Sequence, residues 1–315
     1  MPTIKVKLRK KQDTSYGIII SGNCTDNLPE YLKKQKIGDK YAIITDSKVK
    51  KIYGGSLKKY LRKNGLIAEL FAFSEGEKSK NISTVEKLSE EMIEKGFNRK
   101  DAVIALGGGV VGDTAGFLAS IYMRVGTFYQ PKAVFMDPKY LKTLSRNQIR
   151  NGLAEIIKYG VIMDKNLFTF IEQNLNKIFE LKTGAIEKII TRSVKIKAAI
   201  VEKDEKESKL RMILNYGHTY GHAIEKLSGY KLPHGYAISI GMVIANEIAV
   251  KKGLLKEQDS ERIKNLLKKA GLPVTTMKKP TKKDLLSDKK RYGNILNLIL
   301  PTTIGKAKIY QEKCQ

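Results

Sequence analysis

Short apolar segments alternate with amphipathic ones over residues 1–144, and this alternation restricts the possible folds more than any other feature. The segments that we predict as strands are Ile4–Leu8, Gly17–Ser21, Tyr41–Thr45, Ala68–Phe73 and Ala102–Leu106. Helices are predicted between them, over Lys51–Lys63 and Ile82–Lys95. Strands that alternate with helices along a chain form mostly parallel sheets with helices on both faces. The first part of the chain is therefore predicted to be an α/β, Rossmann-like domain.

The second part, residues 145–315, has helical periodicity almost throughout. The exception is a predicted hairpin near the C-terminus, at Asn294–Leu300 and Lys306–Tyr310. We therefore predict a second, all-α domain after the first. The longest apolar stretch, Tyr236–Val250, is too short for a membrane span and contains Glu247, so it predicts a buried helix and no membrane partner.

The charge of the chain restricts its partners. The formal net charge is +27, from 59 Lys and Arg against 32 Asp and Glu, which favours anionic partners such as nucleic acid or phosphorylated and carboxylated metabolites. The basic residues are mostly lysines spread along the chain, without the arginine-rich or aromatic-interleaved stretch that nucleic-acid binding favours. We predict a small anionic substrate and no nucleic-acid partner; salt-dependent binding to random DNA would support the rival view. The widely separated Cys24 and Cys314 predict a reducing, cytoplasmic location.

All three histidines of the chain, His218, His222 and His234, lie close together in the sequence. His218 and His222 are four residues apart, so on a helix they project from one face. Imidazole is the commonest nitrogen ligand of catalytic metals, and the cluster predicts metal or acid–base chemistry. The alternative is a pair of core histidines with a third on the surface, because so short a motif arises often without function.

A second cluster holds Glu155 and Lys158, which share a helical face because they are three residues apart. A surface ion pair of little energetic consequence is one interpretation. The helix around them is apolar, however, and buried charges need partners. Glu155 with His218 and His234 would form a two-histidine, one-carboxylate site with an open position, which is typical of catalytic zinc.

A glycine run, Gly107-Gly108-Gly109-Val110-Val111-Gly112-Asp113, follows the predicted strand Ala102–Leu106. Glycines let a phosphate approach the backbone, and the start of a helix favours its negative charge. A tight strand-to-helix turn without a ligand is the alternative. Asp113 is then either a helix cap or a carboxylate that faces a cofactor.

These motifs together resemble the 3-dehydroquinate synthase family of sugar-phosphate cyclases. The segments that carry the resemblance occur in the family's order, and they are Gly107–Asp113, Gly152–Gly160, Arg211–Glu225 and Asp288-Lys289-Lys290. The resemblance implies an NAD- and metal-dependent lyase of the shikimate pathway, which converts 3-deoxy-D-arabino-heptulosonate 7-phosphate to 3-dehydroquinate plus phosphate. It also implies a dinucleotide-binding domain, a helical metal-binding domain and a homodimer. Zinc is the implied metal, with cobalt as the alternative. Another sugar-phosphate cyclase and a non-catalytic metal-binding remnant remain alternative interpretations.

The resemblance also implies roles for individual residues. The implied metal ligands are Glu155, His218 and His234. The implied cofactor-binding residues are Asp46, Glu77, Lys80, Gly108, Gly109 and Asp113, with Asp46 on the adenine ribose. The residues implied to hold substrate or relay protons are Lys158, Lys197, Arg211, Asn215 and His222. Arg124 matches an arginine that usually reaches the phosphate of the neighbouring subunit, and either Lys289 or Lys290 matches a contact to the substrate carboxylate.

The chain departs from the family pattern in two places. The family has His-Gly-Glu after the last ligand, where this chain has His234-Gly235-Tyr236. A family segment of a few dozen residues is also absent between Arg124 and Val125. In the family that segment supplies a strand, nicotinamide contacts, and lysine and asparagine contacts to substrate. We therefore expect weakened NAD affinity and negligible turnover.

Overall fold

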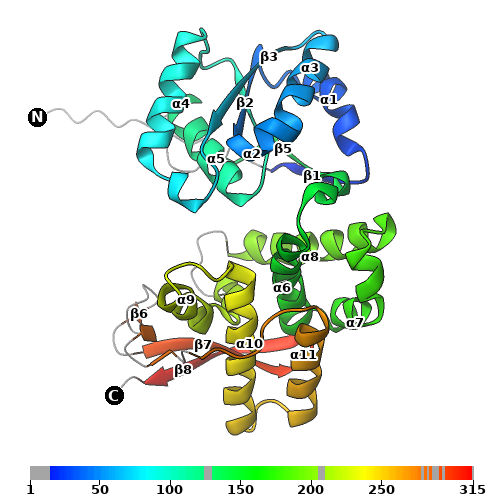
Figure 1. Ribbon diagram of the computed structural model, residues 1–315, viewed down its shortest axis with the longest axis vertical. Helices are drawn as coiled ribbons and strands as arrows, with labels where there is room; N and C mark the ends of the chain where they lie inside the picture. Colours follow the sequence, from blue (N-terminus) through cyan, green and yellow to red (C-terminus); the bar gives the residue numbers. More distant parts are fainter. Residues whose placement is uncertain are drawn as a thin grey trace, which may run out of the picture. The chain divides into compact units, whose positions relative to one another are not determined.

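The computed structural model describes residues 15–123, 130–204, 210–277, 280–281, 284–285, 291–292 and 295–313 (Figure 1). The chain divides into two compact units, and the division falls between Asp137 and Pro138. The predicted strand Ile4–Leu8 lies outside the described residues.

The first unit contains two parallel sheets, as the alternation of strands and helices predicts. In one sheet β2 (Lys40–Asp46) lies between β3 (Ile67–Phe73) and β4 (Ala102–Ala105). In the other, β1 (Gly17–Ile20) pairs with β5 (Ala133–Met136). Among the described residues, β4 has a ladder partner on one edge only, and that partner is β2.

Helices cover both faces of the larger sheet, and the alternation of side chains along β2 shows why. The helices of this unit are α1 (Leu28–Gln35), α2 (Ser47–Val49), α3 (Gly55–Lys63), α4 (Ile82–Glu94) and α5 (Gly109–Met123). Successive side chains of a strand point to opposite faces. Ala42 and Ile44 pack in one core with residues of α4 and α5, whereas Tyr41 and Ile43 pack in another with residues of α1 and α3. The predicted helix Lys51–Lys63 is present, but its first turn is a π-helix over Lys50–Gly54.

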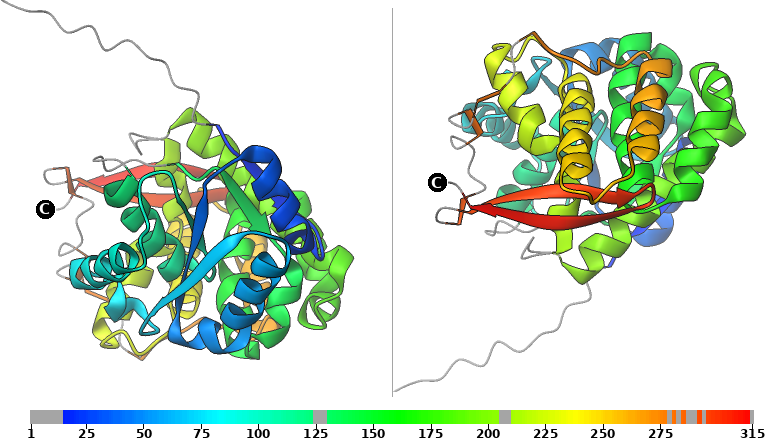
Figure 2. Two further views of the ribbon diagram at one scale, coloured as in Figure 1. Left: turned by 90° about the horizontal axis from the view of Figure 1, so that it is seen from above. Right: turned by 90° about the horizontal axis from the view of Figure 1, so that it is seen from below.

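The second unit is mainly helical. Its helices are α6 (Arg146–Ile162), α7 (Lys165–Phe179), α8 (Thr183–Lys203), α9 (His218–Leu227), α10 (His234–Lys251) and α11 (Glu257–Lys269), with a 3-10 helix, η5, over Leu210–Asn215. The predicted hairpin is present as β7 (Ile295–Thr303) and β8 (Lys306–Lys313), which pair antiparallel, and the short strand β6 (Arg291–Tyr292) pairs with β7. Side chains of β7 join the helical core, and the strand contacts α10 (Figure 1 and Figure 2).

Helix α10 is the central element of this unit. Most of its side chains are buried, among them Ile238, Met242, Ala245 and Ala249, and it contacts α6, α9 and α11. The buried helix predicted over Tyr236–Val250 is thus confirmed. Among the described residues, no helix combines the length and the apolarity that crossing a bilayer requires.

Candidate active site

The backbones of helices α9 and α10 are in direct contact, because glycines of the two elements face each other there. A Cβ atom on Gly241 would lie 2.0 Å from the carbonyl oxygen of Gly217. Gly217 also has φ of 77° at the start of α9, a conformation that glycine adopts without strain. This contact brings the first residues of the two helices, His218 and His234, into one cluster, with ring centroids 5.4 Å apart.

Asn151 joins helix α6 to the first turn of α10 by a hydrogen bond. Its side-chain Oδ1 accepts a hydrogen bond of 2.7 Å from the backbone N–H of Gly235, in the first turn of α10. Glu155 lies one turn further along α6, on the same helical face as Asn151. The hydrogen bond therefore holds Glu155 beside His234.

The three predicted ligands Glu155, His218 and His234 converge, and we call them the metal triad. Nε2 of His218 lies 3.3 Å from Oε1 of Glu155, and Nε2 of His234 lies 3.4 Å from the same oxygen. The other ring nitrogen of each histidine faces an acceptor: Nδ1 of His218 is 3.1 Å from the carbonyl oxygen of Tyr216, and Nδ1 of His234 is 3.1 Å from Oε1 of Glu225.

This donor set fits a divalent metal ion. A proton held on Nδ1 by an acceptor leaves the Nε2 lone pair available for a metal. Two imidazoles and one carboxylate are the protein ligands found in catalytic zinc sites that keep an open position. Two groups of potential metal ligands occur among the described residues. One is the triad, and the other consists of His222, Glu225 and His234, so the two groups share His234.

The charges around the triad favour an ionised Glu155. Burial opposes ionisation, but hydrogen bonds from both triad histidines and the nearby Lys158 ammonium outweigh it and lower the pKa of Glu155 well below its usual range. Hydrogen bonds to Glu155 and Glu225 raise the pKa of His234 to about 9 although its partial burial acts the other way. Burial lowers the pKa of His218, and its hydrogen bond with Glu155 only partly offsets that effect.

Lys158 is a buried cation beside the triad. Its side chain is 4% exposed, and its Nζ lies 2.7 Å from Oε2 of Glu155, so the interpretation as a surface ion pair is wrong. Burial lowers the pKa of Lys158; Glu155 opposes that shift and the positive charge of Lys197 adds to it. The structure thus places two of the predicted substrate residues, Lys158 on α6 and Lys197 on α8, within electrostatic reach of each other.

Three of the other predicted substrate residues lie on α9 and η5. The ring centroid of His222 is 5.4 Å from that of His218 and 5.9 Å from that of His234. Arg211 and Asn215 lie on η5, which is joined to the end of α8 by a 3.0 Å hydrogen bond from the Arg211 backbone N–H to Asp204. Arg124, Lys289 and Lys290 lie outside the described residues.

Three of the predicted cofactor residues form one cluster in the first unit. The Lys80 ammonium lies 2.7 Å from Oδ2 of Asp113 and 3.4 Å from Oε1 of Glu77. The hydrogen bond to Asp113 is the main reason why the pKa of Lys80 is raised. Asp113 is the fifth residue of α5 and pairs with Lys80, so it is not the cap of that helix.

The remaining predicted cofactor residues follow β2 and β4. Asp46 ends β2 and caps α2, because its Oδ1 accepts hydrogen bonds from the backbone N–H groups of Lys48 and Val49 at 2.9 and 2.8 Å. Gly108 lies in the short turn between β4 and α5, and Gly109 is the first residue of α5, which confirms the strand–turn–helix prediction. Within the described part of the chain, nothing lies within 4 Å of a Cβ built on either glycine, so packing does not require glycine there. Their bare backbone is therefore open to an approaching ligand.

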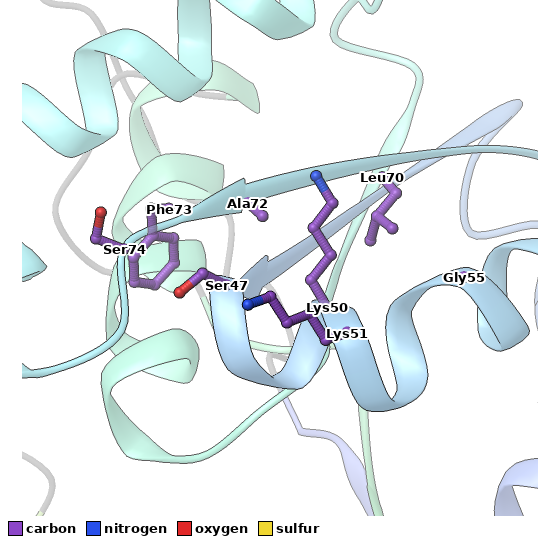
Figure 3. A pocket seen from close by; sticks show the side chains of 8 residues that line it. All are labelled: Ser47, Lys50, Lys51, Gly55, Leu70, Ala72, Phe73 and Ser74. Carbon is purple, nitrogen blue, oxygen red and sulfur yellow. The ribbon is translucent and has the colours of Figure 1, made fainter.

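A hollow of about 530 Å³ opens beside the carboxyl ends of β2 and β3 (Figure 3). Its lining residues are Ser47, Lys50, Lys51, Gly55, Leu70, Ala72, Phe73 and Ser74. Lys50 and Lys51 project from the π-helical turn, while Leu70, Ala72 and Phe73 belong to β3. Apolar side chains with lysines beside them suit a ligand that carries an apolar part and negative charge, and ligands of parallel α/β sheets bind at this end of the strands. Sequence reasoning missed this hollow, because the π-helix that shapes it has no sequence signature of its own.

Comparison with solved structures defines the class of protein. ValA, the 2-epi-5-epi-valiolone synthase of Streptomyces hygroscopicus subsp. jinggangensis with NAD+ and Zn2+ bound, matches with a TM-score of 0.86 and 25% identity, covering 98% of this chain and 95% of that one. A 2-deoxy-scyllo-inosose synthase complexed with carbaglucose-6-phosphate, NAD+ and Co2+ matches with a TM-score of 0.81 and 27% identity, covering 94% and 92%. The fold and the metal triad define this chain as a sugar-phosphate cyclase.

Sequence comparison identifies the family within that class. Residues 70–125 match the 3-dehydroquinate synthase N-terminal family, and residues 152–291 match the 3-dehydroquinate synthase C-terminal family. The 3-dehydroquinate synthase of Caldanaerobacter subterraneus subsp. tengcongensis is 39% identical over 351 residues, covering 99% of this chain and 98% of that relative. The chain belongs to the 3-dehydroquinate synthase family. The aligned length exceeds the 315 residues of the chain, so this relative carries residues that the chain lacks.

Two further residues of the site were not assigned from the sequence. Asn151 joins α6 to α10, and Glu225 accepts from His234. Glu225 does carry a sequence signal, because it follows His218 and His222 at the spacing that keeps residues on one face of a helix. Asn151 carries none, since its partner is a backbone group far away in the sequence.

Proposed function

We propose that this chain is a 3-dehydroquinate synthase by descent. The reaction converts 3-deoxy-D-arabino-heptulosonate 7-phosphate to 3-dehydroquinate and phosphate with NAD and one divalent metal ion, and appreciable turnover requires the family segment that is absent after Arg124. The observation that carries the proposal is the convergence of Glu155, His218 and His234 in a chain of this family. The NAD+ with Zn2+ or Co2+ in the two solved cyclases supports the choice of cofactors, with zinc as the metal and cobalt as the alternative.

The two units hold different groups in this proposal. The metal triad holds the divalent ion in the second unit. The proposed NAD-binding residues of the first unit are Asp46, Glu77, Lys80, Gly108, Gly109 and Asp113. When bound, NAD supplies a hydride acceptor and the metal supplies a Lewis acid. The exposed Lys80–Asp113 pair and the bare Gly108–Gly109 backbone support the assignment of the cofactor to this unit.

Lys158, Lys197 and Arg211 hold the anionic groups of the substrate in this proposal. Lys158 is the best supported of them, because its ammonium is buried beside Glu155, and electrostatic attraction is stronger where water is excluded. Its lowered pKa also suits it to hold or release a proton during turnover. His222 and Asn215 are assigned to proton relay and to the orientation of substrate hydroxyls, and Lys289 or Lys290 to the substrate carboxylate.

We also propose that the chain is a cytoplasmic homodimer without a nucleic-acid or membrane partner. In this arrangement Arg124 reaches the phosphate site of the neighbouring subunit. Light scattering coupled to size exclusion tests the dimer. In the chain that carries the segment of the Caldanaerobacter relative after Arg124, mixing the variants Arg124→Ala and His218→Ala tests the shared site, because recovered activity requires both subunits in one assembly.

Phosphate release from 3-deoxy-D-arabino-heptulosonate 7-phosphate, with NAD and zinc present, tests the reaction. The assay uses the 315-residue chain and the same chain with the segment of the Caldanaerobacter relative inserted after Arg124, with His218→Ala as the inactive control. The likeness to the valiolone and inosose synthases favours a second candidate, a cyclase of another sugar phosphate. Release by the restored chain from a different heptulose or hexose phosphate, and not from the heptulosonate, would establish that candidate instead.

A further inference from the structure

Glu225 is a carboxylate next to the metal triad that has no part in the reaction described so far. It lies on α9, and its Oε1 is 3.1 Å from Nδ1 of His234. Its side chain is 15% exposed, so little water competes for this contact. The two buried residues before it, Ala223 and Ile224, pack against neighbouring helices and fix the position of the helix that carries it.

The orientation of the His234 ring depends on a side-chain acceptor, whereas that of the His218 ring depends on a backbone acceptor. The His218 ring is 12% exposed and bonds to a backbone carbonyl, that of Tyr216, two residues before it. The His234 ring is 42% exposed and begins α10, so packing restrains it less. Among the described residues, the Nδ1 of His234 has the Glu225 carboxylate as its hydrogen-bond acceptor, and this partner belongs to another helix.

We propose that Glu225 is a positioning residue for the metal ligand His234. By accepting the Nδ1 proton it fixes the tautomer and the ring orientation that present Nε2 to the ion. Acceptors of this kind also make the imidazole a better donor, and their loss typically weakens metal binding about 10- to 100-fold. The inference rests on the proposed metal site, and it gives Glu225 no contact with substrate.

The test compares Glu225→Ala and Glu225→Gln with the parent chain and with Glu261→Gln. Glu261 is an exposed carboxylate on α11 that pairs with Lys264, and so it serves as the matched control. Three quantities are measured: the zinc dissociation constant by competition with a chromophoric chelator, the visible spectrum of the Co2+-loaded protein, and the melting temperature of the metal-free protein.

We expect Glu225→Ala to bind zinc about 10- to 100-fold more weakly than the parent. Its Co2+ spectrum should change. Its metal-free melting temperature, measured above pH 9 where the His234 ring is neutral, should stay at that of the control. Glu225→Gln keeps an oxygen acceptor without the charge, so its affinity should fall between those of the parent and Glu225→Ala. If Glu225→Ala does not fold, Glu225→Gln alone decides, and parental zinc affinity in that variant overturns the proposal.

Two other results would also overturn it. One is unchanged zinc affinity with a lowered metal-free melting temperature, which assigns Glu225 a structural role. The other is two zinc ions per parent chain and one per Glu225→Ala chain, which makes Glu225 a ligand of a second ion together with His222 and His234. Failure of the metal site itself is distinguishable, because the parent would then bind no zinc and His218→Ala would change nothing.

Discussion

Lys158 donates a hydrogen bond of 2.7 Å to the carboxylate of Glu155, from a side chain that is only 4% exposed. Removing one partner of a buried ion pair leaves the other charge uncompensated, at a cost of about 3–5 kcal/mol. Because Glu155 keeps partial exposure, we expect Lys158→Ala to lower the free energy of unfolding of the metal-free protein by an amount near the low end of that range. Urea denaturation measures it, with Lys264→Ala on α11 as the surface control, whose cost should stay at about 0–1 kcal/mol. Equal losses in the two variants would mean that Lys158 is solvated.

The metal triad predicts one tightly bound divalent ion per chain. His218→Ala and His234→Ala should each abolish stoichiometric zinc, as measured by elemental analysis of the purified protein. Zinc at 100 times its dissociation constant should stabilise the parent by about 2.7 kcal/mol and raise its melting temperature. Absence of metal together with no thermal response to added zinc would contradict the assignment of these three ligands.

The raised pKa of His234, about 9, makes zinc affinity depend on pH. The metal ion requires the neutral ring, so affinity should rise between pH 6.5 and 9, and binding at pH 7.5 should release a proton. The metal-free protein should behave in the opposite way. A pKa raised above the unfolded value gives a stabilisation that is complete below about pH 6.5 and lost as pH rises towards 9. Calorimetry in buffers of different ionisation enthalpy measures the proton, and His234→Ala should flatten the stability profile; a zinc affinity that is constant over this range would refute the shift.

Arg211 should matter for the anionic substrate and not for the cofactor. We expect Arg211→Ala to weaken binding of inorganic phosphate or substrate far more than binding of NAD, because NAD is assigned to residues of the first unit. Isothermal calorimetry with each ligand separately measures both affinities, and Lys264→Ala is the control for a general loss of positive charge. Equal losses for the two ligands would contradict this division of roles.

The segment absent after Arg124 should cost both activity and stability. Among the described residues β4 pairs on one edge only, so an unpaired strand edge adjoins the glycine run. We expect early amide exchange over Ala102–Met123 compared with the helices of the second unit, and negligible turnover of the heptulosonate phosphate. Inserting the segment of the relative should slow exchange and restore phosphate release, since loss of even one positioning group can cost about 100-fold in rate. Robust turnover by the 315-residue chain would show that other residues supply the lost contacts.

The sequence was most informative where a feature repeats at short range. The alternation of strand-like and helical segments over residues 1–144 predicts the parallel sheet, and helices pack on both faces of β2, as the separate cores around Ala42 and Tyr41 show. The histidine spacing predicts the cluster because one turn of α9 carries both His218 and His222. Contacts between elements far apart in the chain were not predictable in this way. The Asn151–Gly235 and Lys80–Asp113 bonds depend on how whole helices and loops meet, and no local pattern encodes that.

The ligands of the proposed metal site and the groups that orient them, from Asn151 to His234, all belong to helices of one unit and to the short turns between them. The segment that this chain lacks falls in the other unit. Absence of that segment therefore need not disturb zinc binding at all. Zinc content alone is for this reason a poor measure of catalytic competence in a protein built this way.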